Sequence, residues 1–110
     1  VGKYSISGNV VTAICNITVN TIAGGAAGDA ATITGLPFAS AAGITGGGYC
    51  HYLANLTTIN AALTAGIAAS STTATLYHGN GAGTGQTPLT YADTTAGCTL
   101  NYVFTYFIDR

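Results

Sequence analysis

The end of the chain contains a segment of strict alternation that constrains the fold more than any other feature. One set of alternate positions consists of Cys98, Leu100, Tyr102, Phe104, Tyr106 and Ile108. The intervening set consists of Thr99, Asn101, Val103, Thr105, Phe107 and Asp109. Because successive side chains of a β-strand point to opposite faces of a sheet, this pattern predicts a strand with one buried face. Such a strand must pack against a second apolar layer, so the segment predicts an all-β protein.

The chain is short and almost without charge. Its 110 residues are enough for one domain with a buried core. Charged residues make up 5% of the chain, against roughly a quarter in a typical protein. They are Lys3, Asp29, Asp93, Asp109 and Arg110. A net charge of −1 gives no attraction to nucleic acid or to an anionic membrane, and so little charge suits a surface covered by copies of the chain or by neighbouring proteins.

Several features bear on the origin of the chain. It begins at Val1 and contains no Met, so we expect residues 1–110 to be a single domain that is a processed product or a piece of a longer polypeptide. No apolar run reaches the about 18 residues of a membrane span, so we expect no membrane insertion. The three cysteines, Cys15, Cys50 and Cys98, occur in apolar alternation rather than in CxxC pairs. They predict buried thiols in a chain made in a reducing cytoplasm, with one disulfide and one free thiol as the less favoured alternative.

Short strands separated by turn residues are expected along the whole chain. Before the last strand they cover residues 4–6, 10–19, 30–33, 49–56, 72–77 and 87–91. Gly46 to Gly48 are expected to break the chain before a strand that is apolar on both faces. Residues 57–69 fit a helix or a strand, and their strand neighbours favour a strand. The sequence therefore predicts an antiparallel β-sandwich of jelly-roll type with about eight strands.

No arrangement of residues predicts catalysis. The two histidines and the three aspartates are scattered, and the aspartates lie near turns or the terminus, where Asp caps backbone N–H groups. A glycan depolymerase needs paired carboxylates, and only Asp29 and Asp93 are internal. We therefore expect no catalytic residues, no cofactor and no metal. One alternative stays open, in which a symmetric oligomer brings copies of His51 or His78 together at an axis.

The glycine-rich segment from His78 to Gln86 is expected to form a surface loop. It lacks the Lys-Ser/Thr pair and the helix start of a phosphate-binding loop. The tyrosines allow two interpretations, packing in the core and between subunits or stacking on sugar rings. For the second interpretation we expect ligand-binding residues in and after this loop, namely His78, Asn80, Gln86 and Tyr91.

Three motifs together resemble one known family. They are Gly2-Lys3-Tyr4 followed by Gly8-Asn9-Val10-Val11, then Ile33-Thr34-Gly35-Leu36-Pro37-Phe38, then Thr87-Pro88-Leu89-Thr90. The chain resembles over nearly its whole length the small trimeric jelly-roll domains of tailed-phage fibres and related virion proteins. In these a G-x-Y-x-x-x-G-N-x-V strand and a GLPF turn occur in this order. The ending departs from the family, because Phe104-Thr105-Tyr106 matches its closing Gly-Thr-Tyr-like segment only in part.

The resemblance implies a non-enzymatic virion protein that forms a homotrimer, assembles in the host cytoplasm with other virion proteins and becomes part of the virion. It implies a position at a fibre tip or on the virion surface. The first hypothesis is a fibre-tip domain that attaches to a host-surface glycan. The alternative is a purely structural component, such as a capsid decoration, head fibre or collar protein. No binding residue can be carried over, because loops vary greatly within the family.

Overall fold

The protein is an antiparallel β-structure, seen here in a computed structural model that describes residues 2–19, 29–54, 56, 62–79, 86–90, 93 and 97–109. The described strands are β1 (Gly2–Ser7), β2 (Val10–Thr18), β3 (Thr32–Ile33), β4 (Gly46–Ala54), β5 (Leu63–Ile67), β6 (Ala74–Gly79), β7 (Gln86–Pro88) and β8 (Thr99–Phe107). They form one eight-stranded sheet in the order β1-β2-β8-β4-β5-β6-β3, with β7 also paired to β6.

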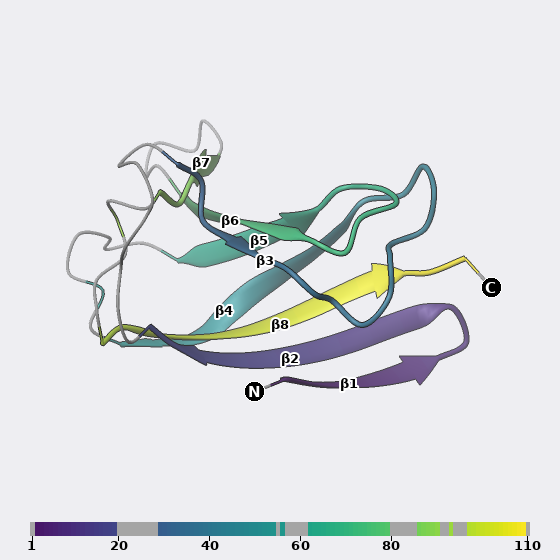
Figure 1. The fold of residues 1–110 in the computed structure, drawn as a ribbon, viewed down its shortest axis with the longest axis horizontal. Helices are drawn as coiled ribbons and strands as arrows, with labels where there is room; N and C mark the ends of the chain where they lie inside the picture. Colours follow the sequence, from purple (N-terminus) through teal and green to yellow (C-terminus); the bar gives the residue numbers. More distant parts are fainter. Residues whose placement is uncertain are drawn as a thin grey trace.

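The sheet curls so that its two ends face each other across the core. In Figure 1, β1, β2 and β8 lie along one side of the molecule, β5, β6 and β3 lie along the other, and β4 joins them. The all-β class, the antiparallel pairing and the strand number are therefore confirmed for the described residues. Because β4 pairs with both β8 and β5, the two halves belong to one continuous sheet. The jelly-roll type stays a prediction.

The inner face of β8 supplies the centre of the core, as its alternation predicts. Tyr102 and Phe104 are 0% exposed, and their rings stack with centroids 5.5 Å apart. On the neighbouring strand β2, Val11 and Ala13 are buried on the same face. Burying a large side chain stabilises a fold by about 1.5–3 kcal/mol, so this row of aromatic rings is a principal source of stability.

The glycine triplet before Tyr49 does not break the chain, contrary to the expectation from sequence. Gly46, Gly47 and Gly48 are the first residues of β4. A Cβ on Gly46 would lie 2.4 Å from Tyr106 Cβ, and a Cβ on Gly48 would lie 2.6 Å from the Phe104 ring. Glycine is required at these two positions because atoms of β8 occupy the space where side chains would be, namely Tyr106 Cβ at Gly46, and the Val103 carbonyl oxygen and the Phe104 ring at Gly48.

The segment that fits both a helix and a strand is a strand where the structure describes it. In β5, Leu63, Ala65 and Ile67 are buried, while Thr64 and Gly66 between them are half-buried. This alternation confirms the favoured interpretation for Leu63–Ile67, residues 62, 68 and 69 lie outside the strand, and residues 57–61 lie outside the described part of the chain.

The GLPF segment closes the open side of the curled sheet. Leu36 is buried in the core, and Phe38 is half-buried against it. The Phe38 ring packs edge-on against Tyr4 of β1, with ring centroids 5.5 Å apart. The Phe38 N–H also donates to the hydroxyl oxygen of Tyr106 at 3.4 Å. We infer that this segment acts as a plug, as its two apolar residues on either side of Pro37 predict.

Candidate functional site

The predicted glycan-binding residues lie at the β6–β7 end of the sheet. His78 in β6 pairs with Thr87, and Gln86 in β7 pairs with Gly79, so His78 and Gln86 occupy adjacent register positions. Because side chains alternate along a strand, these two point to opposite faces of the ribbon. Asn80 and Tyr91 lie outside the described residues. The structure therefore does not bring His78 and Gln86 together on one surface.

The polar atoms of these two residues have partners within the chain. Thr64 Oγ1 donates a hydrogen bond to the side-chain oxygen of Gln86. His78 Nδ1 lies 3.0 Å from the Gly79 carbonyl oxygen. Because the Gln86 oxygen and His78 Nδ1 already have these partners, fewer polar groups at the end of β6 are free to bind a ligand.

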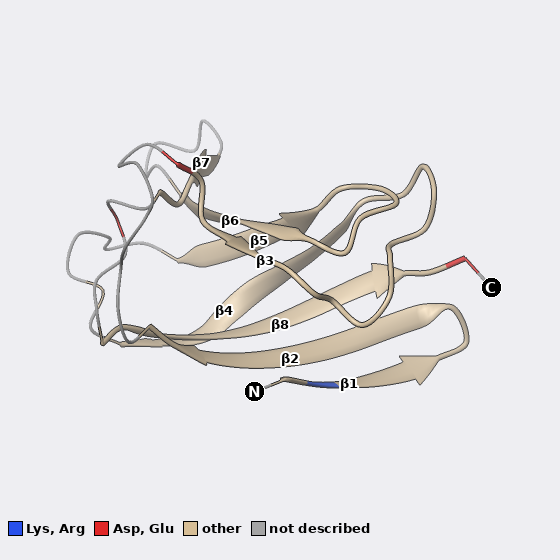
Figure 2. Ribbon diagram, in the orientation of Figure 1, with Lys and Arg blue, Asp and Glu red and all other residues tan. Residues whose placement is uncertain are grey.

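The carboxylates lie at turns and ends, where they bind backbone N–H groups. Asp93 accepts hydrogen bonds at 2.9 Å from the N–H and from the hydroxyl of Thr90. Asp109 accepts one at 2.9 Å from the N–H of Ala42, which lies in a distant part of the sequence. Figure 2 shows acidic positions only at the two ends of the described molecule and one basic position, on β1. The strands between them form an uncharged surface.

The described part of the chain shows no metal-binding cluster and no membrane-spanning helix, and its cysteines are free. No three His, Cys, Asp or Glu side chains there are grouped closely enough to hold a metal ion. No helix among the described residues has the length and hydropathy that a membrane span requires. All three cysteines are free thiols, and Cys98 is fully buried, whereas Cys15 and Cys50 are half-buried against the core.

The outer face of the sheet exposes large apolar side chains on β2 and β8. Ile14 is 46% exposed and Phe107 is 49% exposed. Ile14 pairs with Val103, and Phe107 pairs with Val10, so these four residues cover one part of the outer face. We call them the β2–β8 patch. The nearest charge on this face is Lys3, which pairs with Ile14 at the sheet edge.

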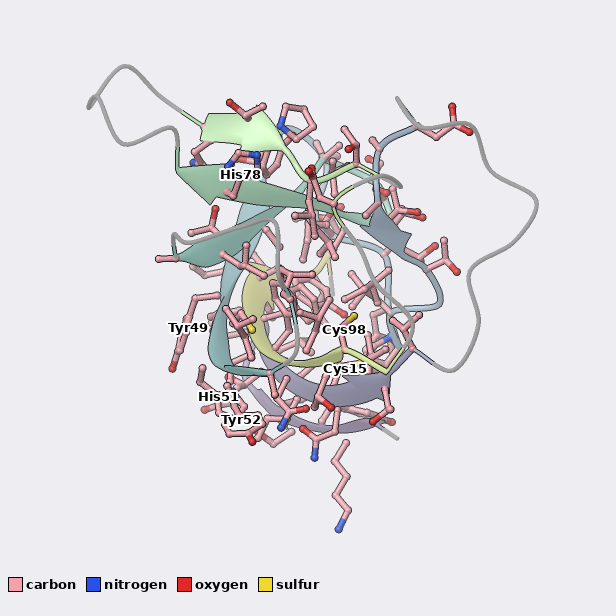
Figure 3. The ribbon with its side chains drawn as sticks, turned by 90° about the vertical axis from the view of Figure 1, so that its left-hand side faces the viewer. Cys15, Tyr49, His51, Tyr52, His78 and Cys98 are labelled. Atoms are coloured by element: carbon pink, nitrogen blue, oxygen red, sulfur yellow. The ribbon has the colours of Figure 1, made fainter. Side chains whose placement is uncertain are left out.

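A β-bulge in β4 places two tyrosines on the same outer face. Cys50 pairs with Tyr102 and Tyr52 pairs with Asn101, so His51 is an extra residue with no partner in β8. In a regular strand, residues three apart point to opposite faces, but the extra residue puts Tyr49 and Tyr52 on one face. Tyr49 is 54% exposed and Tyr52 is 55% exposed. In Figure 3 both tyrosines and His51 lie on the outside of the curled sheet, away from Cys15 and Cys98.

The bulge has its own stabilising contact. The Cys50 thiol donates a hydrogen bond to the Tyr52 carbonyl oxygen, with the two atoms 3.0 Å apart, across the extra residue. Burial raises the pKa of this thiol, so it keeps its proton as a donor at neutral pH. His51 is exposed, whereas Cys50 is half-buried against the core.

Asn101 lies beside the bulge with an unused hydrogen-bond acceptor. It stands in register between Asn16 of β2 and Tyr52 of β4. Its side-chain oxygen Oδ1 is buried and accepts no hydrogen bond within the described part of the chain. Such groups are rare in folded proteins and mark places where a donor from outside the chain can bind.

Comparison with protein-family models, with curated protein sequences and with solved structures finds no match for this chain. The function is therefore inferred from the exposed residues of the sheet.

The tyrosine content of the sequence allows stacking on sugar rings, and the expected ligand-binding residues lie in and after the loop that follows β6. Tyr102 and Tyr106 are instead core residues, while Tyr49 and Tyr52 are exposed. The missed signal is the pattern of apolar residues on both faces of residues 49–56. In the single chain the outer face of this strand is exposed rather than covered.

Proposed function

We propose that the chain is a non-enzymatic domain of a bacteriophage virion protein, of the fibre-tip type, that assembles as a homotrimer and attaches the particle to a host-surface glycan. The observation that carries the proposal is the outer face of the sheet, where Lys3 on edge strand β1 is the only charged residue in the described strands. A soluble monomer normally interrupts such a face with charged residues. Here the β2–β8 patch presents half-exposed Ile14 and Phe107 instead.

The carboxylates support a binding role over a catalytic one. The Asp93 and Asp109 side chains hold backbone N–H groups in place. A hydrolase of glycans uses two carboxyl groups about 5–10 Å apart that face the same bond. Since these two aspartates are already engaged with the fold, we assign them to structure.

The β2–β8 patch is the surface that we assign to contact with sister protomers. Val10, Ile14, Val103 and Phe107 come from two paired strands, and their neighbours Thr12 and Thr105 are uncharged. Substituting lysine for Ile14 would place a charge in the centre of such a contact and should dissociate the trimer. Lysine in place of Thr18, an exposed residue on the same face of β2 outside the patch, is the matched control.

The same patch also fits the purely structural alternative, in which the domain decorates the capsid or forms part of a head fibre or collar. Binding of the purified chain to host cells, with isolated surface polysaccharide as competitor, separates the two functions. The attachment function predicts saturable binding that the polysaccharide abolishes, together with immunogold labelling at the fibre tip. Labelling on the head with no binding to cells would assign the chain to the structural alternative.

A further inference from the structure

We propose that the β4 bulge builds a binding subsite for a neutral glycan, formed by Tyr49, His51, Tyr52 and Asn101 and separate from the loop after β6. The inference deepens the proposed function, on which it rests, by naming the site and the class of sugar. We call these four residues the bulge site.

The geometry of the bulge brings together what a sugar ring requires. Sugars present C–H groups on one face and hydroxyl groups at the rim, so they bind to exposed aromatic rings flanked by hydrogen-bonding groups. Tyr49 and Tyr52 supply two half-exposed rings on one face of one strand. Strand pairing positions both rings, because Tyr49 pairs with β8 and β5 and Tyr52 pairs with β8.

Polar groups stand beside these rings. His51 is exposed within the bulge and can donate or accept a hydrogen bond. Asn101 is paired with Tyr52, and its Oδ1 lacks a donor. A sugar hydroxyl that enters beside Tyr52 would supply that donor, which the described part of the chain does not.

The lack of charge around the bulge site selects the class of glycan. The described residues paired with this part of β4 are Val103, Asn101 and Thr64, none of which carries charge. Among the described residues, the one cation on the outer face is Lys3, which lies on β1, three strands away in the sheet order. An acidic polysaccharide would gain nothing from this surface, so we assign the site to uncharged sugar chains.

The site differs from the β2–β8 patch in composition. The patch consists of aliphatic residues and one phenylalanine, which suits burial against protein. The bulge site consists of two tyrosines, a histidine and an asparagine, each with a polar atom to offer to hydroxyl groups. One sheet face can therefore hold both a subunit contact and a ligand site.

The first test uses the full chain on an array of neutral and acidic bacterial polysaccharides. We expect saturable binding to neutral polymers, and little change in affinity when the salt concentration is raised. Replacing both tyrosines, Tyr49→Ala with Tyr52→Ala, should weaken binding at least tenfold, which corresponds to about 1.4 kcal/mol. The pair Tyr49→Phe with Tyr52→Phe keeps the rings and should retain most of the binding.

Two controls separate the site from its surroundings. Tyr4 on β1 is as exposed as Tyr52, at 55%, and Tyr4→Ala should bind like the unaltered chain. His78→Ala with Gln86→Ala tests the end of β6, and this variant should also bind normally. Nitration of tyrosines by tetranitromethane should be blocked by saturating polysaccharide at Tyr49 and Tyr52 but not at Tyr4.

Asn101 provides a test in which stability and binding move in opposite directions. Asn101→Val removes a buried oxygen that has no donor, so the free energy of unfolding should stay constant or rise. Binding to the same neutral polysaccharide should fall, because the hydroxyl loses its acceptor. A variant that binds as tightly as the unaltered chain would remove Asn101 from the site.

The outcomes distinguish the bulge site from the proposed function. If the unaltered chain binds and the double alanine variant binds equally well, the bulge site is wrong and glycan attachment stands. If the double variant loses its trimeric mass, the tyrosines are subunit contacts and the bulge site is again wrong. If the unaltered chain binds no polysaccharide and no host cell, glycan attachment and the bulge site are both overturned.

Discussion

Strands β8 and β4 lie side by side in the sheet, each has nine residues, and they obtain their structure in different ways. In β8 every second side chain is large and buried, so the sequence of this segment alone predicts a strand and its buried face. In β4 the first three residues are glycines and a bulge interrupts the pairing. Two of the glycines are explained by β8, because Tyr106 Cβ lies against Gly46, and the Val103 carbonyl oxygen and the Phe104 ring lie against Gly48. A strand can therefore be defined by its neighbour as much as by its own sequence.

The largest expected change in the free energy of unfolding comes from comparing the inner and outer faces of β8. Phe104 is 0% exposed and Phe107 is 49% exposed. Phe104→Ala should lower the free energy of unfolding by about 3–5 kcal/mol, because it leaves a cavity in the core. Phe107→Ala should cost a single chain less than about 1 kcal/mol. Urea denaturation followed by circular dichroism measures both, and equal losses would contradict the assignment of inner and outer faces.

The glycines of β4 give the next largest effect. Gly48→Ala would place a Cβ 2.5 Å from the Val103 carbonyl oxygen and should destabilise the fold by about 1–3 kcal/mol. Gly47→Ala is the matched control, since its Cβ would lie 3.4 Å from the Ala65 carbonyl oxygen. Thermal unfolding of the two variants should show a lower Tm for the first and a nearly unchanged Tm for the second. Equal Tm values for the two variants would show that contact with β8 does not require glycine at position 48.

Alkaline pH tests the buried tyrosines of β8. Burial raises the pKa of Tyr102 above its usual value of 10.0, and the neighbouring Cys50 raises it further. Burial also raises the pKa of Tyr106. The unfolded chain therefore loses these phenolic protons first, so the contribution of the two tyrosines to stability is constant below about pH 10 and falls as pH rises above it.

Tyr102→Phe should reduce this loss, because phenylalanine has no proton to release. Urea denaturation from neutral to strongly alkaline pH measures the slope of stability against pH in both proteins. An equal slope for Tyr102→Phe would show that other groups cause the alkaline loss.

Deleting His51 should have the smallest effect on the fold. His51 is the extra residue of the bulge, so its removal leaves Cys50 facing the core and Tyr52 facing outward. We expect the deletion to change the free energy of unfolding by less than about 1 kcal/mol. Deleting Val103 from the regular strand β8 should instead prevent folding, because it moves half of the strand to the wrong face. Circular dichroism and denaturation of the two deletions compare the strands directly.

Much of the fold follows from local patterns in the sequence. The alternation of β8 and β2, the strand at Leu63–Ile67 and the plug formed by Leu36 and Phe38 can all be predicted from residues close together in the chain. The role of Gly48 cannot, because the space it leaves is occupied by a ring some fifty positions away along the chain. Local composition alone makes the triplet look like a turn.

The sequence predicts that tyrosines form the candidate site, but it does not predict which tyrosines or which strand. The abundance of tyrosine indicates aromatic surfaces, yet a single unpaired residue decides which tyrosines are exposed. If His51 were paired as in a regular strand, Tyr49 and Tyr52 would lie on opposite faces. A shift of one residue within a strand that is apolar on both faces leaves no trace in the hydrophobic pattern.

The central claim is that sister protomers cover the β2–β8 patch on the outer face of the sheet. Native mass spectrometry of the unaltered chain at micromolar concentration tests it most directly. We predict a species of three chains, and dissociation to single chains when Ile14 is replaced by lysine. A folded single chain as the main species of the unaltered protein would contradict the account.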